Sequence, residues 1–311
     1  MVNTIKKAIS INPEIEYINN CKIARVISQT DDPFRKKLLI ATLTGKKTAF
    51  STIQLTADYQ ELLDSSITFL DRIVMDAIYT IFISGSDIFT PEMVLRVITG
   101  NMEIDVTPHK RDMVCSIIEK LSSVRICIDC TEEMMARKVI RKGLRCSLES
   151  YLLPLEKIQV MAGNHLKVME AYRLIKKPVL YEYTEKVGQF ITFPTILLDT
   201  KKKGLSDTVE VIQIKRYLIQ RIEQMHHDNK LSSKKISYYW IDSKKGKERG
   251  LLPTMGFKRQ DFSEKEWRKL KSRIHRSVKK VLLHFAEIGY IAGYSIDYKG
   301  RQKIKGVIIE T

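Results

Sequence analysis

The stretch Ser263–Ile288, SEKEWRKLKSRIHRSVKKVLLHFAEI, determines how the rest of the chain is interpreted. Ser263 and Glu266 have the spacing of a capping box, and Gly289 stands where a helix would end. Apolar residues recur every three or four positions and would lie on one helix face: Trp267, Leu270, Ile274, Val278, Val281, Phe285 and Ile288. We therefore predict a single amphipathic helix over 263–288.

The opposite face of this helix is strongly basic. It carries seven cations and one serine: Lys265, Arg268, Lys269, Ser272, Arg273, Arg276, Lys279 and Lys280. Because no acid lies between Glu266 and Glu287, we expect no i,i+4 carboxylate to neutralise these cations within the helix. Nucleic-acid phosphates would favour such a face, since each bound cation releases condensed counterions, and a helix fits the major groove of DNA.

A basic hairpin is predicted directly after this helix. Strands over Tyr290–Asp297 and Gln302–Ile309 would meet at a turn, and four cations lie at or beside that turn: Lys299, Arg301, Lys303 and Lys305. A helix followed by a basic hairpin is typical of a winged helix, in which the helix enters the groove and the hairpin contacts the backbone. We predict that helix 263–288 reads the major groove of double-stranded DNA and that hairpin 298–305 contacts the phosphates. The basic surface lacks interleaved aromatic residues, which favours duplex DNA over unpaired RNA.

Charge is distributed very unevenly along the 311 residues, whose formal net charge is +17. Residues 201–311 hold 27 Lys and Arg against 12 Asp and Glu, a net of +15, whereas residues 1–200 have a net of only +2. Such an asymmetry indicates one domain that faces a polyanion and another with a different task. We take the basic, glycine-containing stretch 200–206 as the boundary and 205–311 as a basic C-terminal winged-helix DNA-binding domain.

The rest of the chain is predicted to hold a β-rich extension over 1–57 and a first winged-helix-like domain with an elaborated β region over 58–199. The expected elements are strands at 22–27, 37–43 and 49–55, a helix from an Asp58 N-cap to Gly85, helices beginning at Pro91 and Pro108, a strand at 124–129, and β-rich runs at 145–151, 178–183 and 189–193. The helix at Pro108 offers a second, weaker set of cations: His109, Lys110, Arg111 and Lys120. Asp112 and Glu119 dilute them, so a packing or dimerisation role suits this domain at least as well as DNA reading. The predicted fold class is α+β.

Several classes of protein are excluded by composition. With 44% apolar residues the chain can build a core, but no run approaches the ~18–20 residues that span a bilayer. Residues 1–15 lack the apolar block of a signal peptide, and five cysteines favour a reducing compartment, so we expect a soluble cytoplasmic protein without membrane contact. The 45–48 segment is not a phosphate-binding loop, and Cys127-x-x-Cys130 lacks a second pair, so its cysteines are predicted to be structural. We expect no catalytic residue, metal or cofactor, and no enzyme.

This pattern resembles the replication initiator proteins of iteron-type plasmids, which have two tandem winged helices. The similarity is architectural and covers 58–311, with its best local support in 263–271 and in the hairpin after Gly289. It implies binding to repeated origin sequences, self-association through the N-terminal domain, and contact with host replication proteins. The extra N-terminal strands and the 127–194 region depart from a minimal winged helix. Two other hypotheses stay open: a transcription regulator whose N-terminal part senses a ligand or partner, and a basic scaffold that binds acidic proteins.

Overall fold

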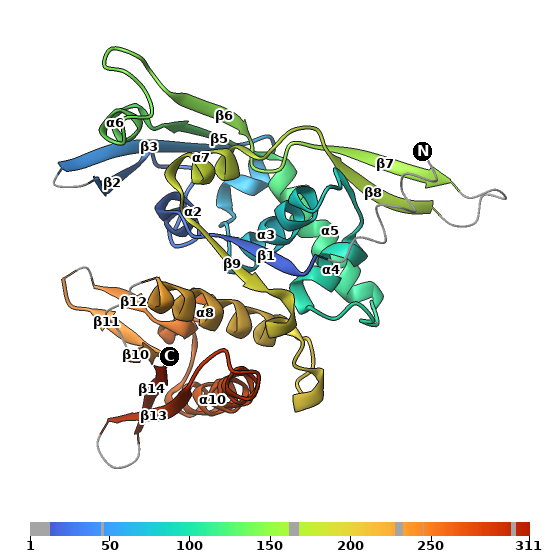
Figure 1. The fold of residues 1–311 in the computed structure, drawn as a ribbon, viewed down its shortest axis with the longest axis vertical. Helices are drawn as coiled ribbons and strands as arrows, with labels where there is room; N and C mark the ends of the chain where they lie inside the picture. The colour runs from blue at the N-terminus through green and yellow to red at the C-terminus, as the bar shows by residue number, and fades with distance from the viewer. Residues whose placement is uncertain (1–12, 45–46, 162–167, 228–232, 245, 300–302) are drawn as a thin grey trace. The chain divides into compact units, whose positions relative to one another are not determined.

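The computed structural model describes residues 13–44, 47–161, 168–227, 233–244, 246–299 and 303–311. The chain divides into two compact units, Met1–Thr192 and Phe193–Thr311, and the basic stretch 200–206 belongs to the second. Helices alternate with small antiparallel sheets in both units, so the fold class is α+β (Figure 1).

The first unit is built on a helical core with sheets around it. In chain order its elements are β1 (Ile15–Asn19), α2 (Lys22–Ile27), β2 (Leu38–Thr44), β3 (Lys47–Ala57), the 3-10 helix η1 (Gln60–Asp64), α3 (Phe69–Ile83), β4 (Ile88–Phe89), α4 (Pro91–Thr99), α5 (Pro108–Ser122), β5 (Val124–Asp129), α6 (Thr131–Ala136), β6 (Ser147–Tyr151), β7 (Leu155–Met161), β8 (Val168–Leu174), α7 (Val179–Val187) and β9 (Phe190–Pro194), which crosses the unit boundary. Twelve of the fifteen α3 residues are buried, so α3 is the central helix of this unit.

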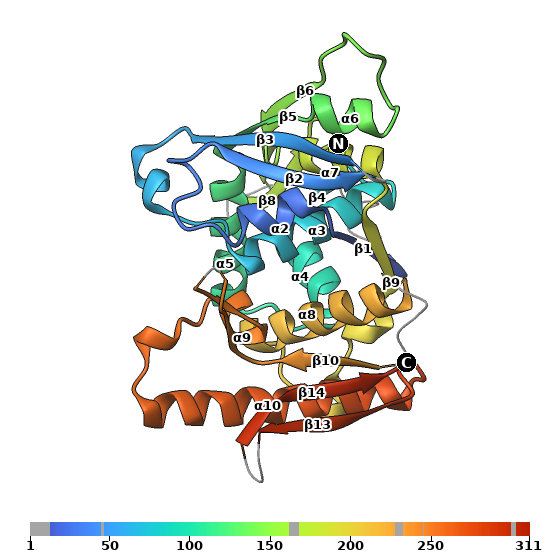
Figure 2. The ribbon, with the colours of Figure 1, turned by 90° about the vertical axis from the view of Figure 1, so that its left-hand side faces the viewer.

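The second unit follows with fewer elements. They are the 3-10 helices η2 (Thr195–Leu198) and η3 (Lys201–Lys203), then α8 (Val209–His226), β10 (Ser233–Ser237), β11 (Trp240–Asp242), β12 (Lys247–Arg249), α9 (Leu251–Thr254), η4 (Arg259–Asp261), α10 (Glu264–Glu287), β13 (Gly293–Lys299) and β14 (Lys303–Glu310). The core is formed by the apolar stripes of α8 and α10 against the sheet β10–β14–β13. Figure 2 shows α10 running alongside the β13–β14 hairpin.

The two units repeat one order of elements, although their sequences show no repeat. In the first unit the order is α3, β4, α4, α5 and the hairpin β7–β8, with sheet order β4–β8–β7. In the second it is α8, β10, α9, α10 and the hairpin β13–β14, with sheet order β10–β14–β13. The insertions differ, because β5–α6–β6 lies after α5 whereas β11–β12 lies before α9. Helices α5 and α10 therefore hold the same place in the repeated order.

The strand predicted at 124–129 has a different role from the one expected. It forms β5, which pairs with β3 and β6 in a four-stranded sheet of order β2–β3–β5–β6, rather than returning beside α5 as a hairpin strand. Alternate β5 residues are buried, which places this strand over the core with its other face exposed. The hairpin of the first unit is β7–β8 instead, formed by residues 155–161 and 168–174.

Three other predictions about local structure are wrong. Residues 22–27, predicted as a strand, form helix α2, because Cys21 Sγ caps Ala24 N and Ile23, Ala24 and Ile27 pack inward at helical spacing. Residues 178–183, predicted to be β-rich, begin helix α7, whose buried residues also recur with the helical period. Residues 236–241, which the sequence pattern predicts as one strand, contribute to two separate strands, β10 and β11.

The long helix predicted from Asp58 begins eleven residues later. β3 continues to Ala57, and the Asp58 N–H still bonds to Ser123 O, so the chain leaves the sheet too late to start a helix there. Thr68 and Asp71 form the actual capping box of α3. Local capping residues at Asp58 were overridden by strand pairing with a segment distant in sequence.

Candidate nucleic-acid interface

Helix α10 is fixed at its start and along its inner face. Ser263 Oγ accepts from Glu266 N, and the Glu266 carboxylate accepts from Ser263 N at 2.9 Å, which is the predicted capping box. Trp267, Leu270, Ile274, Val278, Val281 and Phe285 are buried, as the periodicity predicts, whereas Ile288 is exposed and caps the C-terminus. His275 Nδ1 lies 2.7 Å from Tyr238 Oη, which ties the flank of α10 to the residue after β10. The outer face of α10 is therefore held in a defined direction.

All eight residues predicted on the outer face of α10 are exposed. They are Lys265, Arg268, Lys269, Ser272, Arg273, Arg276, Lys279 and Lys280. The helix thus brings together one continuous basic surface, which we call the α10 basic face. That these residues bind DNA stays a prediction.

Three of these cations have partners inside the protein. Arg268 Nε lies 3.0 Å from Glu264 Oε1 four residues earlier, which corrects the expectation that no i,i+4 carboxylate acts within the helix. Arg273 Nη2 lies 2.7 Å from Glu210 Oε2 of α8, and Lys280 Nζ donates to Gly204 O at 3.3 Å. The Arg268 and Arg273 side chains keep 71% and 57% of their surface exposed, so these pairs contribute little to stability and leave the guanidinium groups open to an anion.

The side chains of the remaining four cations of the α10 basic face form no ion pair or hydrogen bond within the described part of the chain. These are Lys265, Lys269, Arg276 and Lys279. Lys269 and Lys279 act on neighbours only through their charge. The pKa of Glu266 is lowered first by hydrogen bonds from Ser263 and then by Lys269. The pKa of His275 is lowered first by burial and then by Lys279. A free cation needs no internal bond to be broken before it contacts a phosphate.

The hairpin adds cations beside the helix. Lys303 and Lys305 on β14 are exposed, whereas the Lys299 side chain and Arg301 lie outside the described residues. Lys271, which the sequence analysis did not select, is half-buried on the flank of α10, and its pKa is lowered first by burial and then by the charge of Lys303. The hairpin also contacts α10 directly, because Tyr294 Oη of β13 donates to Lys279 O at 3.5 Å.

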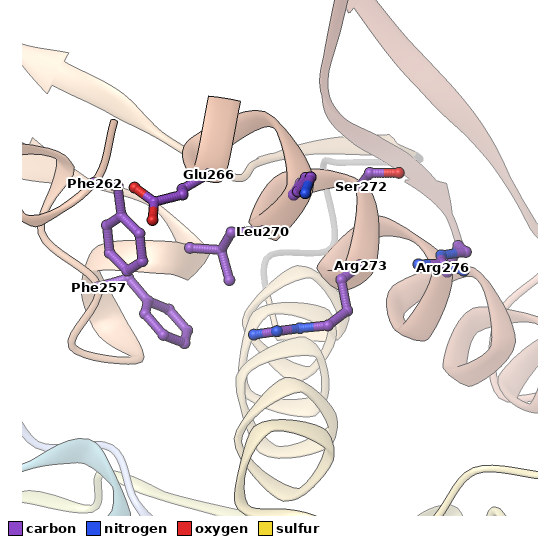
Figure 3. Close-up of a pocket in the computed structure, with 8 residues that line it drawn as sticks. Phe257, Phe262, Glu266, Leu270, Ser272, Arg273 and Arg276 are labelled. Atoms are coloured by element: carbon purple, nitrogen blue, oxygen red, sulfur yellow. The ribbon is translucent and has the colours of Figure 1, made fainter. Parts of the chain in front are cut away.

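An open groove of about 500 Å³ lies beside the first half of α10. Figure 3 shows Arg273 and Arg276 extending from the helix, with Phe257, Phe262 and Leu270 at the other end of the groove. Phe257 and Phe262 meet edge to face, with ring centroids 6.1 Å apart. Phe262 fits a hydrophobic staple with Trp267, and their ring centroids are 5.7 Å apart, whereas nothing in the sequence indicates that Phe257, in the loop after α9, lines a groove. The groove thus combines two aromatic rings and Leu270 with the Glu266 carboxylate at one end, and has two guanidinium groups at the other.

Comparisons with known proteins give little. No family model matches this sequence, and no curated protein matches it either. Among solved structures, two crystal structures of domains 2 and 3 of RctB are similar in fold. One matches with a TM-score of 0.45 and 12% identity over 92% of this chain and 96% of that chain. The other, of selenomethionine derivatives, has a TM-score of 0.41 and 11% identity over 88% and 90%. Likenesses at this level assign no function.

Helix α5, the counterpart of α10 in the first unit, uses its main cations internally. Arg111 lies 3.0 Å from Glu92 and 3.4 Å from Glu170, and these charges raise its pKa against the opposing effect of burial. Lys120 Nζ lies 2.5 Å from Asp71 Oδ2, whose side chain is buried in the α3 capping box. Arg111 and Lys120 thus join α5 to other elements of its own unit, whereas the Lys110 side chain has no such partner among the described residues.

The structure does not assemble a metal centre in the residues it describes, where no group of three or more His, Cys, Asp and Glu is placed to hold an ion. Cys130 lies beside Cys146, Sγ to Sγ 3.6 Å, rather than beside Cys127 of the C-x-x-C sequence, whose Sγ lies near Ser147.

Across the described ranges, no helix has both the length and the apolar character that a membrane span requires.

Proposed function

We propose that this chain is a sequence-specific double-stranded DNA-binding protein, most specifically a replication initiator of a plasmid or related mobile element, with no catalytic activity of its own. In this proposal the second unit is a winged helix, in which α10 enters the major groove and hairpin 298–305 contacts the backbone. One observation carries it. Four exposed cations of α10 have side chains that form no ion pair or hydrogen bond among the described residues.

The geometry suits a duplex better than another polyanion. A helix of 24 residues is about 36 Å long, comparable to one turn of DNA, so its ends can reach phosphates on both sides of a groove. Arg268 and Arg276 are long enough to reach base edges, where arginine bonds guanine in a bidentate way. Ser272 lies between them on the same face and can donate or accept a hydrogen bond. These residues would supply sequence reading, and the lysines around them would supply backbone affinity.

The initiator interpretation is supported by the repeated order of elements in the two units. Two units that repeat one order of elements, the second with a free basic helix among the described residues, fit the two tandem winged helices of an iteron-binding initiator. Self-association through the first unit, contact with host replication proteins and a cytoplasmic location belong to the same proposal. A transcription regulator would use the second unit in the same way and differs in its target.

Binding to duplex DNA at increasing salt, followed by footprinting on the DNA that flanks the gene, tests the proposal. We expect a steep salt dependence, with a slope of about −0.9 for each phosphate contact. Protection of direct repeats supports an initiator, and protection of a palindrome at a promoter supports the regulator instead.

The variant Arg268→Ala with Arg276→Ala is expected to weaken binding at least tenfold while circular dichroism stays unchanged. Both side chains point away from the core, so their loss should not alter the fold. Binding that is insensitive to salt, or normal affinity in this variant, would overturn the proposal.

A further inference from the structure

The first unit carries an exposed basic loop outside the interface described above. Residues 137–145, RKVIRKGLR, connect α6 to β6, and we call them the α6–β6 loop. Five of its nine residues are Arg or Lys and none is Asp or Glu, although residues 1–200 as a whole have a net charge of only +2. The loop belongs to the β5–α6–β6 insertion, which has no counterpart in the second unit.

The α6–β6 loop has a defined backbone conformation. Lys138 adopts a left-handed conformation with φ 62°, which ends helix α6, and Val139 N then donates to Met134 O at 2.9 Å. A second turn closes with the bond from Leu144 N to Arg141 O at 3.2 Å. Gly143, with φ 91°, supplies the positive dihedral that this turn requires. The backbone of the loop is therefore held by hydrogen-bonded turns near both of its ends.

The base of the loop is anchored in the core of the first unit. Glu133 of α6 is buried and accepts hydrogen bonds from Ser51 Oγ at 2.8 Å, from Tyr183 Oη at 2.6 Å and from Arg137 Nε at 3.0 Å. On the other side, Cys130 N donates to Cys146 O at 3.1 Å, which extends the β5–β6 ladder to the loop. Figures 1 and 2 both show the loop extending out from the end of the β5–β6 pair.

Four of the five cations are available to a ligand. Arg137 is held by Glu133. The side chains of Lys138, Arg141, Lys142 and Arg145 are exposed and form no ion pair or hydrogen bond within the described part of the chain. Arg145 contributes to the low pKa of Asp129, which hydrogen bonds from Thr131 lower more strongly. Four like charges on a rigid, solvent-exposed loop repel one another, and an ordinary surface loop would intersperse acids.

We infer that the α6–β6 loop is a second nucleic-acid contact, which binds the phosphate backbone without reading bases. The inference rests on the proposed DNA-binding function and adds the first unit to the binding surface. Phosphate is the favoured ligand because the loop offers closely spaced cations on a fixed backbone, with no groove or extended element that could read base edges. Val139 and Leu144 are 49% and 56% exposed, but two apolar residues on an irregular loop do not make the continuous apolar face of a membrane-binding helix.

The test compares two variants of the full chain with equal loss of charge. The loop variant is Arg141→Gln with Lys142→Gln and Arg145→Gln, and Lys138 is kept because its left-handed backbone disfavours most substitutions. The control is Lys36→Gln with Lys47→Gln and Lys176→Gln, three exposed lysines of the same unit that likewise have no partner among the described residues. The probe is a mixed-sequence duplex of about 60 base pairs, roughly 200 Å long, titrated at several salt concentrations.

The loop variant is expected to reduce the magnitude of the salt slope by about 2 to 3, because each lost phosphate contact removes about 0.9. Its affinity at moderate salt should fall at least tenfold, while the control variant binds like the natural chain. Equal behaviour of loop variant and control would overturn the inference while leaving the α10 interface intact. If the loop variant instead loses binding to vesicles containing anionic lipid and keeps its DNA binding, the loop is a membrane contact and the inference fails. The proposed function has its own test, which it fails if the variant Arg268→Ala with Arg276→Ala binds DNA with normal affinity.

Discussion

Helices α5 and α10 occupy the same place in the two units, yet their cations have opposite fates. In α5, Arg111 is tied to Glu92 and Glu170, and Lys120 to the buried Asp71, so the charges serve the structure of the first unit. In α10 four cations have no partner among the described residues. Equivalent positions in a fold therefore do not give the cations equivalent partners. Which carboxylates lie nearby decides whether a basic helix can take an external anion.

The hairpins of the two units also differ, in how far each pairs with a third strand. Breaking this pairing in the second unit is expected to have the largest effect on stability. β14 pairs with β10 over five positions, whereas β8 pairs with β4 over only two. Gly306 lies where a Cβ atom would come within 2.0 Å of Ile236 O, a backbone atom of β10. Gly306→Ala is expected to separate β10 from β14 and to destabilise the second unit by at least about 2 kcal/mol.

Chemical denaturation followed by circular dichroism measures this loss, and DNA binding should fall with it. Gly293→Ala in β13 is the matched control, because its added Cβ would meet only Glu310 at an ordinary 3.7 Å. Similar stability of the two variants would show that the hairpin is not held by β10 in the way described.

Lys120→Gln breaks the comparison from the side of α5. Removing the ammonium leaves the carboxylate of Asp71, which is only 3% exposed, without its charged partner, so the first unit should lose about 2 kcal/mol of unfolding free energy. Affinity for duplex DNA should stay the same, because this cation serves the fold. Lys110→Gln on the same helix is the control and should change neither quantity. A loss of DNA affinity in the folded Lys120 variant would mean that α5 also contacts DNA.

Glu210→Gln sharpens the comparison from the side of α10. It releases Arg273 from its pair at 2.7 Å, and an exposed pair of this kind is worth up to about 1 kcal/mol, so DNA affinity should rise by about two- to fivefold. Glu92→Gln, which removes one acid from Arg111 on α5, is the matched control and should leave affinity unchanged. If both variants bind DNA more tightly to the same extent, only net charge matters and the location of Arg273 does not.

The smallest expected effect concerns pH. Burial, and then the charge of Lys279, lowers the pKa of His275, so the unfolded chain takes up this proton before the folded one does. Unfolding free energy should therefore fall as pH drops below about 6.5, by no more than about 1.4 kcal/mol per pH unit, and level off below the folded pKa. Denaturation of the natural chain and of His275→Gln between pH 7 and 5 measures the difference. Parallel pH profiles would exclude a lowered pKa for this histidine.

The sequence was sufficient to predict α10 because everything that defines it is local. Ser263 and Glu266 are three residues apart, and the apolar period lies within one helix. The start of α3 could not be predicted in the same way, because β3 continues to Ala57 and Asp58 bonds to Ser123, 65 residues later in the chain. Local capping patterns compete with strand pairing, and here the pairing prevailed.

The sequence could not predict which cations lack an internal partner, for a related reason. The partners of Arg111 and Lys120 lie 19, 59 and 49 residues away, at Glu92, Glu170 and Asp71, so only the fold brings them together. Lys271 was overlooked because its position on the helical wheel is near the apolar stripe, and its neighbour Lys303 belongs to another element. Charge counts located the basic unit, and contacts were needed to identify the side chains that can bind.

The salt dependence of duplex binding by two charge-matched variants tests the central claim most directly. One variant replaces the four unpaired cations of α10 with glutamine, at Lys265, Lys269, Arg276 and Lys279. The other replaces four lysines of the first unit that also lack partners among the described residues: Lys36, Lys47, Lys110 and Lys176. The account predicts that the magnitude of the salt slope falls by about 3 to 4 in the α10 variant. In the other variant the slope should stay close to that of the natural chain, because only its general charge is reduced. Equal slopes in the two variants would contradict it.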